Sequence, residues 1–456
     1  MRKLIFVFFL FFTNYGMAQD TIKSIDLETF LIQVRENHPL SFVTNNNISQ
    51  AEQLTVYSKG AFDPRGIAQI DQKYFNGKTY YSTLSTGVKI PTRFGVQFKG
   101  MVDWNRGEYL SPENFTPSNG LGLLGVEVQL GRGLLTDEQR TQLKRAENAL
   151  LLSAVERNIA LNDLLYEAGT DYIFWQECYN QMLLAQRMAQ LAEKRLSQIK
   201  LKVIAEDRPA IDTVEASAIY TQRLFDLNQR TLNEKNARLK VESYLWDQGL
   251  IPLYFDSIVF PPELTVQPII LSQAAELNET PYLRAYDFKL IDLNYERKLK
   301  IEQLKPQLSI NYNLLQEPQY AFNTYNLNNY KWGGSFYMPL FLRKERSSLE
   351  LTKLKIENTK YELSLKQREL TIKQQQLFNE WTAQIEQTEQ LTKITQNYLK
   401  LVEGEQSLFE LGESTVFLIN MREITYINSQ VKLLETQAKT NKSYLTVRYL
   451  QGGFTP

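Results

Sequence analysis

The sequence offers few side chains with the chemistry of a catalytic or metal site. It contains one cysteine, Cys178, and one histidine, His38. A single cysteine cannot form an internal disulfide, and a single histidine leaves neither a His/Cys cluster for zinc nor a second imidazole for a proton relay. We interpret Cys178 as a packing residue and His38, beside Pro39, as a helix-start residue. These counts argue against most hydrolase and metalloenzyme functions.

Charged residues at helical spacing are the other candidates for a catalytic site: Asp212, Glu215, Arg422 and Glu423. Such side chains far more often form a solvated or inter-helix charged network than a reactive centre. Tyr172 and Trp175 are most simply packing residues on a helix face. The sequence therefore predicts a protein that is not an enzyme, without catalytic, cofactor-binding or metal-binding residues.

The composition is that of a folded protein without a nucleic-acid partner. Of the 456 residues, 43% are hydrophobic and 22% are charged, which is too apolar for a disordered chain. The 51 Lys and Arg residues balance the 51 Asp and Glu residues. The chain therefore lacks the positive excess that non-specific binding to nucleic-acid phosphates requires.

Residues 1–18 have the pattern of a secretory signal peptide. Two basic residues precede an apolar run at 4–12, and small residues occupy positions 16 and 18. That run is too short for a membrane core about 30 Å thick. We expect cleavage after Ala18, and Gln19 at the new terminus cannot take a lipid anchor of the bacterial lipoprotein kind. No later run of 18 apolar residues occurs, so if the mature chain enters a membrane, it must span it as a closed β-barrel.

Two stretches without proline, 134–204 and 343–411, predict very long helices. Each would be about 105 Å long, which is too long for the inside of a compact domain. In the second stretch apolar residues recur every seven positions, the repeat that keeps one stripe against a neighbouring helix: Leu349, Ile356, Leu363, Leu370 and Leu377. We expect long antiparallel helix pairs.

The chain contains one structural repeat twice, at 19–248 and 269–456, joined by a Pro-rich linker at 249–268. His38-Pro39 and Thr280-Pro281 each open a helical stretch, and a second proline follows the first after 25 positions in both cases. Strands are expected next, at about 66–130 and about 307–340, and then the long helix. Each long helix ends in a short polar turn, and shorter helices follow at about 212–246 and about 416–450.

The strand regions have the pattern of membrane strands. Polar and apolar residues alternate at 69–74 and at 94–99, and aromatic residues cluster near strand ends. This suits strands with one lipid face and one wet face. We expect four strands per chain, which cannot close a barrel of useful width, so closure needs a cyclic homo-oligomer. The span 80–121 is long for a simple connection, and residues 89–94 could turn an additional hairpin.

Together with this duplicated architecture, several motifs resemble those of the TolC-type outer-membrane factor family, the trimeric channel-tunnels of Gram-negative efflux and secretion systems. The resemblance extends over nearly the whole mature chain, from the segment 25–28 (IDLE) to the segment 449–452 (YLQG). Its most telling segments are 409–414 (FELGES), 420–423 (NMRE) and 209–216 (PAIDTVEA).

The resemblance implies a mostly helical fold with a membrane β-barrel. In a homotrimer, each chain would give four strands to a twelve-stranded outer-membrane barrel and its helices to an α-helical tunnel through the periplasm. The turns between long and short helices would form the periplasmic tips, which meet a periplasmic adaptor (membrane fusion) protein and close the entrance at rest. Matched to this sequence, the tips are Ala205, Glu206, Asp207, Arg208, Leu411, Gly412, Glu413 and Ser414.

Two departures from the family pattern concern these tips. Family tips commonly place a glycine in both turns, whereas Glu206 and Asp207 occupy the first turn here. The best-known members carry acidic side chains just past the second glycine, where this chain has 418–420 (LIN). Cation-sensitive gating by an acidic ring is therefore not predicted. The candidate gate residues at this end are Asp212, Glu215, Asn420 and Arg422.

The function implied by the resemblance is a passive exit duct in a tripartite efflux or type I secretion system. Its partners would be the adaptor, an inner-membrane transporter of RND or ABC type, and outer-membrane lipid. The alternative is a periplasmic coiled-coil protein with a structural or adhesive role and no channel activity. That alternative explains the helices but not the two strand regions.

Overall fold

The computed structural model describes residues 23–255, 259–266, 280–317 and 326–454. The expected signal peptide at 1–18 and part of the expected linker lie outside the described residues. The chain divides into two compact units. The described parts of 1–41, 163–271 and 377–449 form the helical unit, and those of 42–162, 272–376 and 450–456 form the sheet unit.

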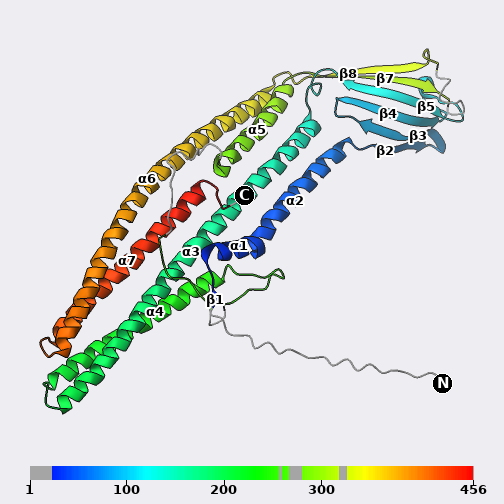
Figure 1. The fold of residues 1–456 in the computed structure, drawn as a ribbon. Coiled ribbons are helices and arrows are strands. Elements are labelled where there is room, and N and C mark those ends of the chain that lie inside the picture. The colour runs from blue at the N-terminus through cyan, green and yellow to red at the C-terminus, as the bar shows by residue number, and fades with distance from the viewer. Residues whose placement is uncertain (1–22, 256–258, 267–279, 318–325, 455–456) are drawn as a thin grey trace, which may run out of the picture. The chain divides into compact units, whose positions relative to one another are not determined.

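The sheet unit contains one antiparallel sheet, which has six strands within the described ranges (Figure 1). From one edge of the sheet to the other, the strands are β2 (Arg65–Phe75), β3 (Lys78–Pro91), β4 (Val96–Arg106), β5 (Leu121–Gln129), β7 (Gln307–Gln316) and β8 (Tyr330–Tyr337). The expectation of four strands is wrong. The span 80–121 contains the further hairpin, and the turn between β3 and β4 lies at 92–95, which overlaps the turn expected at 89–94.

Four helices of the sheet unit continue directly into or out of this sheet. α2 (Pro39–Lys59) leads through the 3₁₀ turn η1 (Gly60–Phe62) into β2, and β5 leads into α3 (Glu138–Ile204). In the second repeat, α5 (Pro281–Glu302) leads into β7, and β8 leads into α6 (Arg343–Glu410). The two repeats meet at these junctions, where the Arg132 amide donates to the Pro306 carbonyl at 2.7 Å.

Polar side chains and one apolar stripe hold the helices of the sheet unit together. The Arg145 guanidinium of α3 donates to both carboxylate oxygens of Asp292 on α5, at 2.8 and 2.9 Å. The predicted seven-residue stripe of α6 faces inward, since Ile356 and Leu370 are 7% and 4% exposed. The heptad prediction is therefore confirmed in this unit.

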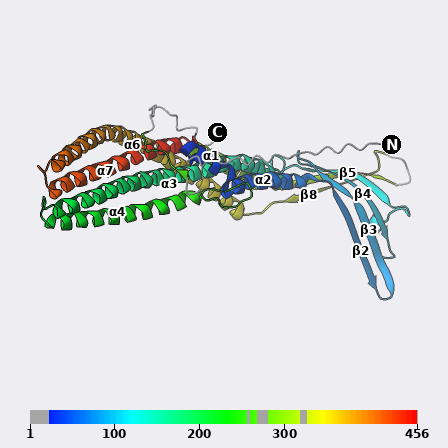
Figure 2. The same cartoon turned by 60° about the horizontal axis from the view of Figure 1, so that its bottom comes forward.

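The helical unit consists of α1 (Leu27–Asn37), α4 (Ile211–Glu242), α7 (Val416–Leu450) and the later parts of α3 and α6. Figure 2 shows α3, α4, α6 and α7 running alongside one another in this unit. Near the turns they share a cluster of buried apolar residues that includes Ile199, Phe409 and Ile419. No helix in the described part of the chain is long and apolar enough to cross a membrane.

A break at His38 separates α1 from α2. Proline lacks an N–H group and disfavours helical backbone in the residue before it, and His38 accordingly has an extended ψ of 136°. Its ring Nδ1 accepts a hydrogen bond from the Leu40 amide at 3.2 Å. The interpretation of His38 as a helix-start residue is confirmed.

The linker between the repeats crosses the helical unit as an ordered strap over its described part. Its short strand β6 (Val259–Phe260) pairs in parallel with β1 (Lys23–Ser24) near the N-terminus. The Pro262 carbonyl accepts from Gln176 at 2.9 Å, and the Thr265 carbonyl accepts from Asn441 at 2.8 Å. Tyr172 and Trp175 are fully buried, and the Trp175 ring stacks on Phe255 of the linker, which confirms that both are packing residues.

Candidate functional site: a two-faced sheet and paired helix turns

The first candidate site is the surface of the sheet, whose even-numbered residues form one apolar face. The strand register places these residues opposite one another from edge to edge: Ile70 faces Leu84, Leu84 faces Trp104, Phe98 faces Val126, Val126 faces Tyr312, and Tyr312 faces Trp332. Most of the large side chains are open to the outside. Ile70 is 71% exposed, Trp332 67% and Phe336 69%. A contiguous apolar patch of this kind marks an interaction surface on a folded protein.

The odd-numbered residues form the opposite, polar face of the same sheet. Ser85 donates to Asp103 at 2.5 Å, Lys99 pairs with Glu127 at 3.8 Å, and the hydroxyls of Ser309 and Ser335 lie 2.6 Å apart. Alternation along a strand places successive side chains on opposite faces, so one pattern produces both surfaces. The sheet therefore has one apolar face and one polar face.

The second candidate site is the pair of turns at the ends of α3 and α6. In both turns one residue has left-handed backbone: Glu206 with φ +58° and Gly412 with φ +84°. The hydrogen bonds are also equivalent, since Asp207 donates to the Lys202 carbonyl and Glu413 donates to the Leu408 carbonyl, each at 2.9 Å. This is the Schellman pattern of helix ends. Gly412 adopts this conformation without Cβ strain, and Glu206 adopts it at the matching position of the first turn.

Arg208 joins the two turns. Its guanidinium donates to the Ser414 carbonyl at 3.0 Å, pairs with Asp212 at 3.4 Å and lies 4.6 Å from the centre of the Phe409 ring. Ser414 itself is only 4% exposed, and its hydroxyl donates to Glu405 at 2.5 Å. Leu411, by contrast, is 75% exposed. The predicted tip residues therefore divide into exposed ones and a buried contact that holds the turns together.

The four candidate gate residues have separate contacts. Asp212 pairs with Arg208, and the Asn420 side-chain oxygen accepts from Arg223 at 3.3 Å. Arg422 lies 3.6 Å from Glu405 and is 48% exposed, while Glu215 is partly exposed. The structure of one chain therefore does not assemble these four residues into one cluster.

A buried ion pair in the same unit confirms that Glu423 belongs to an inter-helix charged network, although its partner Arg195 was not predicted. Arg195 of α3 donates through both terminal nitrogens to Glu423 of α7, and these side chains are 7% and 3% exposed. Arg223 lies nearby with an unpaired and buried Nε, and burial lowers the pKa of this guanidinium. The partners are 228 positions apart, so helical spacing alone could not join them. A charged residue on an otherwise apolar helix face was the available signal.

Cys178 has the environment of an unreactive thiol. It is 5% exposed, and burial raises the pKa of the thiol to about 11. A thiol with so high a pKa is almost entirely protonated near neutral pH, whereas nucleophilic attack needs the thiolate. Its interpretation as a packing residue is confirmed.

With the fold and both sites described, the chain can be compared with known proteins. Its structure aligns over 94% of its length with 85% of the Campylobacter jejuni CmeC outer membrane channel, at a TM-score of 0.65 and 13% identity. The outer-membrane channel OprN aligns over 91% of its chain, with a TM-score of 0.69 and 13% identity. The Neisseria gonorrhoeae MtrE outer membrane channel aligns over 89%, with a TM-score of 0.62 and 13% identity. No family model and no curated protein sequence matches.

These similarities define the class of fold. The chain has the fold of outer-membrane channels of the TolC type, as the motifs in its sequence imply. The shared features are the long paired helices and the curled antiparallel sheet.

Proposed function

We propose that this protein is the outer-membrane channel-tunnel of a tripartite efflux or type I secretion system. It is a passive exit duct for substrates that an inner-membrane transporter of RND or ABC type delivers with a periplasmic adaptor. The observation that carries this proposal is the sheet, whose exposed apolar face is continuous from Ile70 to Trp332 and whose other face is polar.

The two faces fit a wall between lipid and water. Apolar side chains in water are unfavourable at about 25 cal/mol per Å², and lipid tails would remove this cost. The polar face would line a watery interior. Inside a bilayer the free edges of the sheet also need partners, because each unpaired backbone group costs several kcal/mol there. Several copies must therefore join, and we propose a homotrimer in the outer membrane.

A second, uncovered stripe on α6 supports this assembly. It consists of five apolar residues at successive spacings of three, seven, four and seven positions, each 40% to 71% exposed: Leu351, Leu354, Tyr361, Leu365 and Ile372. Such a stripe is a coiled-coil seam without a partner in its own chain. We propose that a neighbouring copy covers it.

The paired turns are the proposed docking surface for the adaptor. Besides Leu411, the helix ends next to the two turns carry Ile204 and Ile211, which are 79% and 67% exposed. Apolar side chains at helix tips suit the tips of partner hairpins, with the exposed Glu206 and Glu413 as a polar rim. The gate residues Asp212, Glu215, Asn420 and Arg422 are proposed to act at this same end.

Export in living cells tests the proposal. In a strain that lacks the gene, we expect dye efflux to fall, and the intact gene to restore it. Leu411→Asp should leave the protein in the outer membrane and abolish both efflux and chemical crosslinking to the adaptor. Leu239→Asp is the matched control, because Leu239 is 58% exposed on α4 and distant in sequence from either turn.

Two results would contradict the proposal. Unchanged efflux in the deletion strain, together with recovery of the protein from the soluble periplasmic fraction of the parent strain, would favour the structural or adhesive coiled-coil protein. Intact-mass analysis of the purified protein tests the expected start at Gln19 without a lipid. Retained residues 1–18 or an acylated terminus would contradict that part.

A further inference from the structure

We propose that the β3–β4 hairpin is part of the channel wall, so that three chains of six strands form an eighteen-stranded barrel in place of the family's twelve. This inference rests on the proposed function, because it needs several copies around one channel. It predicts a barrel about 1.5 times as wide, since diameter grows roughly linearly with strand number.

The register shows that the hairpin belongs to the sheet along its whole length. β3 pairs with β2 from Arg65↔Lys89 to Phe75↔Lys78, and β4 pairs with β5 from Val96↔Val128 to Asp103↔Leu121. β3 and β4 thus separate β2 from β5, the strands that continue into helices. A hairpin in an outer loop would leave β2 and β5 paired with each other.

The hairpin also carries both faces of the sheet. On the apolar face it contributes Leu84, Val88, Phe98 and Trp104, which continue the rows of β2 and β5. On the polar face, Ser85 bonds Asp103 within the hairpin, and Lys99 reaches Glu127 of β5. A hairpin outside the channel wall would not need its polar and apolar residues to alternate in register with those of the neighbouring strands.

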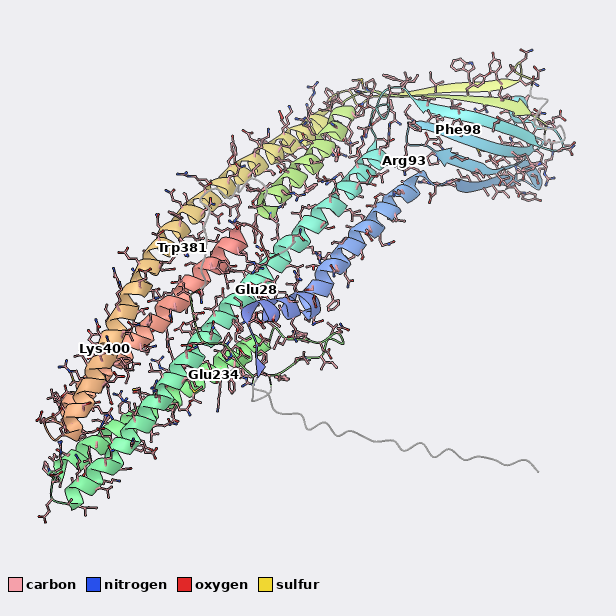
Figure 3. All side chains as sticks on the ribbon, in the orientation of Figure 1. Glu28, Arg93, Phe98, Glu234, Trp381 and Lys400 are labelled. Atoms are coloured by element: carbon pink, nitrogen blue, oxygen red, sulfur yellow. The ribbon has the colours of Figure 1, made fainter. Side chains whose placement is uncertain are left out.

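The turn of the hairpin is fixed at the helical end of the sheet. The Arg93 guanidinium lies 5.9 Å from the ring of Phe62, which ends the η1 turn after α2. Gly95 has φ +78°, and a Cβ there would lie 3.3 Å from the Arg140 side chain of α3 and from the Gly133 carbonyl oxygen. Figure 3 shows Arg93 at this end and Phe98 within the sheet. β3 and β4 therefore run from one end of the sheet to the other.

The occupant of the two open edges is a second copy of this chain. The outer edges of β2 and β8 have no strand partner among the residues that the structure describes, and both strands are exposed along almost their whole length. An even number of antiparallel strands leaves β2 and β8 running in opposite directions. The β8 edge of one chain can therefore pair with the β2 edge of the next in the same antiparallel pattern.

The test measures the width of the barrel by double electron–electron resonance. A spin label is placed at Lys331→Cys on the polar face of β8, with Cys178→Ser as background. Three labels at one height on an eighteen-stranded barrel should lie about 31 Å apart, against about 21 Å for twelve strands. The comparison variant replaces residues 76–120 with Asn-Gly, which joins β2 to β5 and keeps odd-numbered residues on one face.

We expect the distance in the intact protein to exceed that in the shortened variant about 1.5-fold. A trimer with a distance near 21 Å, equal in both proteins, would overturn the wider barrel and leave the proposed function standing. The absence of any inter-chain distance would overturn the proposed function as well. If the shortened variant does not fold, the distance in the intact protein alone separates the two barrel sizes.

Discussion

The two repeats of this chain are almost equal in their helices and unequal in their strands. α3 has 67 residues and α6 has 68, and both end in the same left-handed turn. The first repeat nevertheless contributes four strands to the sheet and the second contributes two. The length of each long helix is fixed by the helices that pack along it and by its end turn, which contacts the end turn of the other long helix. A hairpin adds two strands and restores the original chain direction, so the fold accepts growth in the sheet more easily than in the helices.

The long helices also differ in burial. α3 carries fully buried residues such as Leu161, Tyr172 and Trp175, whereas α6 keeps the exposed stripe of Leu351, Leu354, Tyr361, Leu365 and Ile372. More of the buried core therefore lies on α3 than on α6, although α3 also has exposed apolar residues such as Leu151 and Phe174. We propose that a neighbouring copy covers the stripe on α6.

The largest effect is expected from breaking that stripe. The double variant Leu354→Glu and Leu365→Glu places two carboxylates in the proposed seam, where burial without a partner costs several kcal/mol per charge. We expect loss of the trimer in native mass spectrometry of the detergent-solubilised protein, with helical circular dichroism retained.

The control for the stripe is the double variant Lys355→Glu and Lys360→Glu, which makes a larger charge change at two exposed positions of the same helix. It should remain trimeric. A trimer in both variants would show that the stripe is not an interface.

The next largest effect concerns the ion pair between the repeats. Glu423→Ala leaves Arg195 buried without its partner, which should lower the free energy of unfolding by about 3–5 kcal/mol. Replacing both members, as Arg195→Met with Glu423→Leu, should recover most of this loss. Thermal unfolding followed by circular dichroism measures both. Arg422→Ala, at an exposed pair, should change stability by less than about 1 kcal/mol. An equal change in Glu423→Ala and Arg422→Ala would refute the role of the buried pair.

The two turns allow a direct exchange of residues. Gly412→Glu should destabilise the protein by about 1 kcal/mol, because a side chain strains left-handed backbone, and no heavy atom lies within 4 Å of a Cβ there to add contacts. Glu206→Gly should stabilise it by up to about 1 kcal/mol for the same reason. Urea titration of the two variants should give shifts of opposite sign. Shifts of the same sign would mean that contacts of the Glu206 side chain outweigh its backbone strain.

The features predicted correctly from sequence are those that depend on local patterns. Proline-free stretches and the seven-residue stripe located α3 and α6, and the X-Pro steps at His38-Pro39 and Thr280-Pro281 located helix starts. Alternation located strands in both repeats. The predicted number of four strands was wrong because residues 80–121 contain glycine, aromatic and turn residues that obscure a strand boundary. The length of that span was the usable signal.

The candidate site was predictable to a smaller extent. The turns at 205–208 and 411–414 follow from helix ends, so their positions were found. The contact of Arg208 with the Ser414 carbonyl and the pairing of Arg195 with Glu423 depend on which helices lie together. Such partners, separated by more than 200 positions, follow from tertiary packing that no local pattern specifies.

The smallest effect is expected at His38, which precedes the first proline of α2 as Thr280 precedes the first proline of α5. Burial lowers the pKa of His38, so the folded protein favours the neutral imidazole. In the unfolded chain this group titrates near 6.5. The folded state then binds fewer protons than the unfolded state below that pH, and stability that is complete above pH 6.5 falls as the pH drops toward and through the folded pKa. His38→Thr copies the second repeat and removes this proton linkage. Between pH 7.5 and pH 5.5, the native protein should lose more melting temperature than the His38→Thr variant. Other groups titrate equally in both proteins, so the difference between the two losses isolates His38. Equal losses would show that the ring is solvated enough near Tyr244 and Trp246 to titrate as it does in the unfolded chain.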